Sequence, residues 1–160
     1  MKTASPRVHH NEGDKLEREI GGLVGERCWH ARLGYGDELK LDIGRKVPYK
    51  SRKLKGLLRG TWTVGSRATP WKLTCASGVV SSRSKRSKIE AALGEVVGNV
   101  QAVTVGSRRM SLTIKIGSQF TLTIENRSVA ATDDLPYWEV FTPQRTCIQA
   151  GPGRNWVHRK

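Results

Sequence analysis

Short segments in which polar and apolar residues alternate, bounded by glycines, run through most of the 160-residue chain. Side chains on a strand point alternately to the two faces of its sheet, so this period of two indicates strands with one buried face. The pattern predicts strands over 26–34, 38–44, 60–66, 70–80, 100–106, 110–117, 119–126, 137–143 and 146–153. We therefore expect an α+β fold that is mostly β and is built on one or more antiparallel sheets.

One segment has the period of a helix instead. Within 87–97 the apolar residues fall on one helical face, and Ser87 and Glu90 have the spacing of a capping box. The face consists of Ile89, Ala92, Leu93, Val96 and Val97. The sequence thus predicts one short amphipathic helix at about 87–97, and "DKLEREI" (14–20) predicts the start of another with Asp14 at its N-cap.

The strand pattern repeats along the chain. Residues 23–44 align with 96–117 at an offset of 73, and beyond them "GTWTV…PWKL" resembles "SQFTLTI…PYWEVF". This predicts two half-repeats, about 23–80 and 96–153, each a small meander that ends in a strand containing Trp. Chance agreement between alternating apolar residues is the other explanation. The first copy carries an insertion, "RKVPYKSRKLKGLLR" (45–59), where the second has a tight turn at Gly117-Ser118.

These patterns predict a single β-rich domain over 14–153, a flexible tail over 1–13 and a basic tail over 154–160. Neither an apolar leader segment nor a run of 18 apolar residues is present. The three cysteines are widely spaced and include no C-x-x-C pair, which argues against a disulfide framework and a zinc ribbon. We expect a cytoplasmic protein that does not enter a membrane.

The charge of the chain is strongly uneven. It has 28 Lys and Arg against 14 Asp and Glu, for a net charge of +14. No acidic residue lies between Ile43 and Ile89, while that window holds 13 of the 28 cations. A concentration of cations without counter-charges opposes compaction, and it is typical of a surface that binds a polyanion. Long solvated loops are the alternative.

We assign the predicted polyanion-binding surface to two segments, the insertion and the entry to the helix at 87–97. Its residues are Arg45, Lys46, Tyr49, Lys50, Arg52, Lys53, Lys55, Arg59, Arg83, Lys85, Arg86 and Lys88. Tyr49 is included because an aromatic ring between cations can stack on a base. The four cations at the helix entry oppose the helix dipole, a conflict that a bound phosphate would relieve.

Catalytic chemistry has little support in the sequence. Glu38 and Lys40 form an E-x-K pattern of the kind found in metal-dependent nucleases, but the pattern is common on exposed strand faces. We expect no enzyme activity, no catalytic residues, no metal site and no cofactor, and we keep the nuclease as a remote alternative.

"PWKL" followed by a turn, then "YWEVFTP" and "AGPG", resembles a group of small uncharacterised bacterial proteins that end in a Trp-x-Leu-Phe-x-Pro strand. The resemblance covers about 23–153, and Val140 replaces the usual Leu. Some members neighbour toxin genes, so the resemblance implies an immunity or antitoxin role. The sequence therefore predicts a non-enzymatic module that binds nucleic acid or another polyanion, with an immunity-like protein that blocks an acidic partner protein as the alternative.

Overall fold

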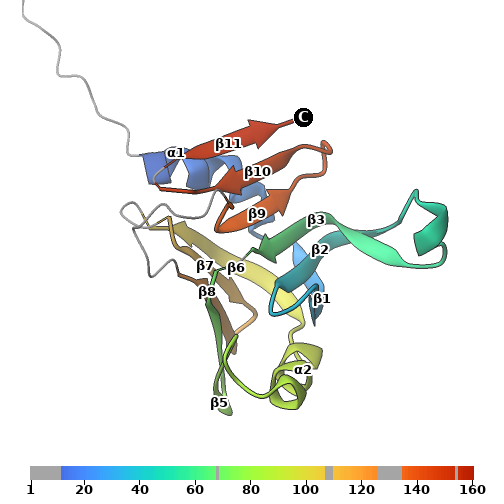
Figure 1. Cartoon of the computed structure of the whole chain (residues 1–160), viewed down its shortest axis with the longest axis vertical. Coiled ribbons are helices and arrows are strands. Elements are labelled where there is room, and N and C mark those ends of the chain that lie inside the picture. Colours follow the sequence, from blue (N-terminus) through green and yellow to red (C-terminus); the bar gives the residue numbers. More distant parts are fainter. Residues whose placement is uncertain (1–11, 68, 107–109, 126–134, 154) are drawn as a thin grey trace, which may run out of the picture.

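The computed structural model describes residues 12–67, 69–106, 110–125, 135–153 and 155–160. Its eleven described strands form one antiparallel sheet in the order β11-β10-β9-β3-β2-β1-β6-β7-β8-β4-β5 (Figure 1). The strands are β1 (Arg27–Leu33), β2 (Leu39–Pro48), β3 (Leu58–Ser66), β4 (Trp71–Cys75), β5 (Gly78–Ser81), β6 (Gly98–Val105), β7 (Leu112–Ile116), β8 (Phe120–Ile124), β9 (Trp138–Phe141), β10 (Cys147–Ala150) and β11 (Trp156–Arg159). The prediction of a mostly β, antiparallel fold is confirmed.

Strand alternation reflects burial, as the pattern predicts. In β7 and β8 every second side chain is buried, from Leu112 to Ile116 and from Phe120 to Ile124. Buried side chains from both ends of the strand order contribute to one core, and Trp138 is its largest fully buried side chain. No helix in the described part of the chain is long and apolar enough to cross a membrane.

In the described part of the chain, two α-helices and two short 3-10 helices accompany the sheet. They are α1 (Glu12–Glu19), η1 (Gly21–Leu23), η2 (Arg52–Leu54) and α2 (Arg86–Gly94). α1 packs against β6, with Leu16 fully buried, and begins inside the segment 1–13 that we expected to be a tail. Asp14 consequently lies within this helix, not at its N-cap.

The capping box predicted for α2 is wrong. Lys85 occupies the N-cap without a side-chain hydrogen bond, and Ser87 already lies inside the helix. The Glu90 carboxylate instead accepts a hydrogen bond from Arg86 Nε at 2.9 Å, one helical turn away. Ile89 and Leu93 are buried as predicted, but the helix ends at Gly94, so Val96 and Val97 lie beyond it and Val97 is exposed.

The predicted C-terminal tail is also wrong over most of its length. Residues Trp156–Arg159 form β11, which pairs with β10 as the outermost strand at one edge of the sheet. Its four residues include two cations or potential cations and only one aliphatic side chain, so the alternation that identified the other strands is weak here.

The two halves of the sheet pair in corresponding registers. Ile43 pairs with Trp62 as Ile116 pairs with Phe120, and both first hairpins carry an irregularity at the same place, Cys28/His30 and Val100/Ala102. The offset is 72 in the first strand of each half and 73 in the second, because the loop between them is one residue longer in the second half. The duplication stays a prediction, and these registers are a further observation in its favour.

The last hairpin of each half pairs with the other half. β4 and β5 follow the first half but add to β8, while β9 and β10 follow the second half and add to β3. Trp71 Nε1 donates to Asp37 O at 2.8 Å, and Trp138 Nε1 donates to Met110 O at 2.7 Å. The prediction that each half is a meander ending in its own Trp-bearing strand is therefore wrong, because β4 pairs with β8 and β9 pairs with β3.

Candidate nucleic-acid interface

The insertion 45–59 is an ordered extension of the β2–β3 hairpin, which we call the arm. Strand pairing continues outward through Lys46↔Gly60, Val47↔Arg59 and Pro48↔Leu58, and η2 forms part of the turn at the outer end. Figure 1 shows the arm projecting from the body of the molecule. The matching hairpin of the second half closes directly after Ile116, so the sheet itself does not need the arm.

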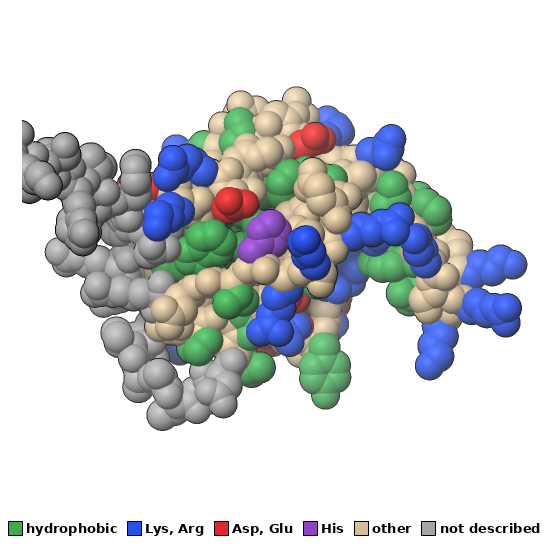
Figure 2. Space-filling view, turned by 90° about the horizontal axis from the view of Figure 1, so that it is seen from above, with side chains coloured by type: hydrophobic (Ala, Val, Ile, Leu, Met, Phe, Trp, Pro, Cys, Tyr) green, Lys and Arg blue, Asp and Glu red, His purple; other side chains and the backbone are tan. Residues whose placement is uncertain are grey.

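The arm concentrates positive charge and contains no acidic residue of its own. It holds seven Lys and Arg and no Asp or Glu, and six of the seven are exposed while Arg59 is half-buried. Figure 2 shows Lys and Arg side chains gathered on this protruding end. Lys50, Arg52, Lys53 and Lys55 make no ion pair with any residue that the structure describes. Their charges are therefore free to contact an anion.

A β-bulge in β2 marks the base of the arm. The register with β3 slips between Ile43 and Lys46, so that β2 has one more residue than its partner there. Gly44 has a φ of 86°, a conformation that side chains with a Cβ rarely adopt. At Gly60 a Cβ would meet the backbone of Ile43, so β2 and β3 approach too closely there for a side chain. Bulges bend a strand, and this one sets the direction of the arm.

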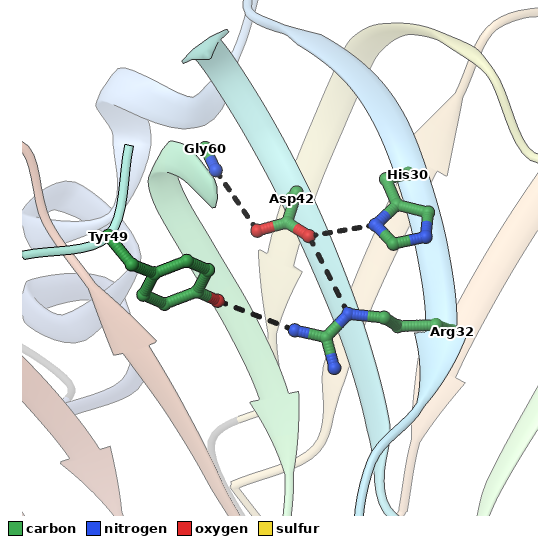
Figure 3. A network of polar contacts seen from close by, with 5 residues as sticks. All are labelled: His30, Arg32, Asp42, Tyr49 and Gly60. Atoms are coloured by element: carbon green, nitrogen blue, oxygen red, sulfur yellow. Dashed lines mark hydrogen bonds and ion pairs between the residues drawn. The ribbon is translucent and has the colours of Figure 1, made fainter. Parts of the chain in front are cut away.

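A buried carboxylate supports the bulge. Asp42 has no exposed surface, and its Oδ1 accepts the backbone N–H of Gly60 at 3.0 Å. Its Oδ2 lies 3.1 Å from His30 Nδ1 and 3.9 Å from Arg32 Nε (Figure 3). A buried carboxylate needs such partners, because desolvating an unpaired charge is costly.

Tyr49 connects the arm to this network. Arg32 Nη2 donates to the Tyr49 hydroxyl at 3.5 Å, and the Tyr49 backbone N–H donates to Leu57 O at 3.3 Å. Tyr49 is half-buried against its own hairpin. Its position indicates a role in holding the arm, and base stacking by this ring stays a prediction.

Lys46 is also partly engaged within the fold. Its Nζ lies 4.8 Å from the centroid of the Trp29 ring, close enough for a cation–π interaction. The irregularity in β1 places Trp29 and His30 side by side, and their rings stack with centroids 5.7 Å apart. Trp29 is half-buried beside these polar residues and lies outside the core cluster.

The second predicted cluster lies apart from the arm. Arg83, Lys85, Arg86 and Lys88 are all exposed at the entry to α2, which Figure 1 shows well separated from the arm. Arg86 pairs with Glu90, and Arg83 lines a cavity of about 330 Å³ together with Asp37, Glu38 and Arg67. The structure does not bring the two halves of the predicted surface together.

Nothing in the described residues assembles a nuclease metal site. Glu38 precedes β2 and lines the cavity just described, Lys40 is half-buried on β2, and no group of three or more His, Cys, Asp or Glu is placed to hold a metal ion among the described residues. The thiols are poor nucleophiles at two positions, because burial raises the pKa of Cys28 to about 12 and that of Cys147 to about 11.

Sequence reasoning missed two parts of this region. The first is the Asp42 network, whose only signal was an acid between Leu41 and Ile43, on the face of β2 opposite the core. The second is a group of exposed leucines at the outer end of the arm, Leu54, Leu57 and Leu58. Their signal was the sequence "LKGLL" inside a basic segment.

Comparison of the chain with family models, curated proteins and solved structures finds no match. The resemblance to small bacterial proteins that end in a Trp-x-Leu-Phe-x-Pro strand therefore stays a prediction.

Proposed function

We propose that this protein binds nucleic acid through the arm, chiefly by contacts between Lys or Arg and phosphates. The observation that carries the proposal is the placement of seven cations and no acid on an ordered, protruding hairpin that the sheet does not require. Like charges held this close repel one another, and a polyanion relieves that repulsion while releasing its own counterions.

The order of the arm favours binding over mere solvation. A flexible loop would lose conformational entropy when it bound, whereas a paired hairpin has already lost it during folding. The bulge, the buried Asp42 and the contact between Arg32 and Tyr49 hold the base of the arm in one direction. The cations are thus presented in a fixed arrangement.

We assign a lesser role to the cations at the entry to α2. One of the four, Arg86, is already paired with Glu90. The cluster is also separated from the arm in Figure 1. It therefore offers a matched control of equal charge.

The test compares two variants whose net charge falls from +14 to +10. One replaces Lys50, Arg52, Lys53 and Lys55 with Gln, and the other replaces Arg83, Lys85, Arg86 and Lys88 with Gln. Binding to a fluorescent DNA duplex of mixed sequence is measured between about 50 and 200 mM salt. The slope of log K against log[salt] is negative, and we expect it to be shallower by about 3 to 4 in the arm variant, since each lost phosphate contact removes about 0.9 from its magnitude.

In the α2 variant the magnitude of that slope should decrease by less than half as much. Equal losses in the two variants would mean that net charge, not the arm, controls binding. Absence of salt-dependent binding by the unaltered protein would reject the proposal. Tight binding of a single acidic protein, without binding to DNA, would favour the immunity-like alternative.

A further inference from the structure

Three leucines are exposed at the outer end of the arm. Leu54, Leu57 and Leu58 expose 37%, 55% and 46% of their surface, and they lie within five residues of one another. They are three of the ten large hydrophobic side chains exposed among the described residues. Single exposed leucines are ordinary, but a cluster of them on a projecting element marks an interaction site.

These side chains have no role in the core. None of them belongs to the buried cluster or packs against it, and the turn is closed by backbone hydrogen bonds. Leu57 N donates to Leu54 O at 3.0 Å, and Tyr49 N donates to Leu57 O. Polar residues at these positions would leave the same backbone bonds in place.

The surrounding charges restrict what can cover the leucines. A second copy of the arm would bring another seven cations against the first set, with no acid on either arm to compensate. A bilayer fits less well because shallow insertion requires an apolar face separated from a charged one. At the turn, Leu54 alternates with Arg52, Lys53 and Lys55 within four residues, which does not separate two such faces.

A DNA duplex combines the two features that the outer end of the arm needs. It offers apolar base-pair faces between two rows of phosphates, and proteins reach these faces by inserting Leu, Ile, Phe or Pro side chains between base steps. A β-ribbon can enter the minor groove of B-DNA, from which apolar wedges act, whereas the major groove of A-form RNA is too narrow for side chains to read. The arm is such a ribbon, with Pro48 exposed opposite Leu58.

We propose that the leucines of the arm insert between base pairs of double-stranded DNA and bend it, while the neighbouring cations hold the phosphates on either side. This inference rests on the proposed function and adds the class of nucleic acid and the mode of contact. It separates two roles within the arm: Lys and Arg determine affinity and its dependence on salt, and Leu54, Leu57 and Leu58 determine the distortion.

The experiment uses the full chain with all its cations and replaces Leu54, Leu57 and Leu58 with Ser. Energy transfer between dyes at the two ends of a short duplex reports bending. We expect the unaltered protein to raise the transfer on binding. The triple variant should keep the same salt slope, bind about tenfold more weakly and leave the transfer unchanged.

A duplex with a central mismatch provides a second measurement, because an unpaired step is already partly unstacked. The unaltered protein should bind it about tenfold more tightly than the matched duplex, and the triple variant should bind both alike. Far-UV circular dichroism and the thermal midpoint confirm that the variant is folded.

The outcomes are distinct. Salt-dependent binding without a change in transfer, or equal bending by the triple variant, overturns the insertion and leaves the proposed function standing. Absence of binding by the unaltered protein at low salt overturns both. Leucine-dependent binding to phosphatidylglycerol vesicles without DNA bending overturns the insertion and assigns the leucines to a membrane surface.

Discussion

At the scale of single residues, Asp42 is a charged side chain that is packed inside the protein. It is a fully buried acid immediately beside the acid-free part of the chain, and it joins β1, β2 and β3 through His30, Arg32 and Gly60. The sequence alone showed only an acid inside a strand. Its importance depends on three partners from two other strands, and no local pattern specifies these.

Replacing Asp42 with Asn should destabilise the protein by about 1–3 kcal/mol, because a buried hydrogen-bonding network loses its charge and Arg32 loses its counter-charge. Urea unfolding monitored by Trp fluorescence measures the effect. Asp37→Asn is the control, since the Asp37 side chain is exposed and only its backbone oxygen accepts the Trp71 hydrogen bond. Equal stability of the two variants would contradict a supporting role for Asp42.

At the scale of elements, the arm shows what a comparison between the halves can predict. Its boundaries at 45 and 59 followed from the alignment of the β2–β3 region with the tight turn of the second half. The alignment did not reveal that the inserted residues continue both strands. "RKVP" and "LLRG" lack the alternation of a half-buried strand, because neither face of the arm is covered.

Removing 45–59 and changing Gly60 to Ser should leave the fold intact. The shortened connection between Ile43 and Trp62 would be Gly-Ser-Thr. It would match the turn Gly117-Ser118-Gln119 between Ile116 and Phe120 in the second half. The net charge falls from +14 to +7 because seven cations leave with the arm. We expect an unchanged far-UV spectrum and loss of DNA binding.

A collapsed or aggregated product would contradict this prediction, since it would mean that the arm supports the sheet. Asp42→Asn in the shortened chain serves as a companion variant. With Gly60 moved and Tyr49 removed, the carboxylate has fewer partners, and its removal should cost less there than in the full chain.

At the scale of the whole molecule, the strands were predictable and their partners were not. The nine ranges predicted from alternation overlap ten of the eleven described strands, β1 to β10, because one buried face imposes the same period in every topology. The exchange of β4–β5 and β9–β10 leaves no trace in that period. The two indole hydrogen bonds, to Asp37 O and Met110 O, link each Trp back to its own half, and no local pattern revealed them either.

The exchange predicts that neither half folds alone. Fragments 1–95 and 96–160 should each lack stable structure, since β4–β5 without β8 is an isolated two-stranded hairpin and β3 without β9 has an open edge. Mixing them should restore the far-UV spectrum and the Trp fluorescence of the intact chain. Stable folding of either fragment on its own would contradict the prediction.

The pairing of each last hairpin with the other half also determines when the strands can pair during synthesis on the ribosome. β3 is complete at Ser66, yet its neighbour β9 begins only at Trp138, so 71 residues must be added before that edge can be covered. Trp71 in β4 likewise cannot pair until its partner Ile124 in β8 has been synthesised. While those 71 residues of the 160 are being made, the nascent chain carries a finished cationic hairpin and an uncovered sheet edge, and the edge of β3 is covered only when β9 emerges.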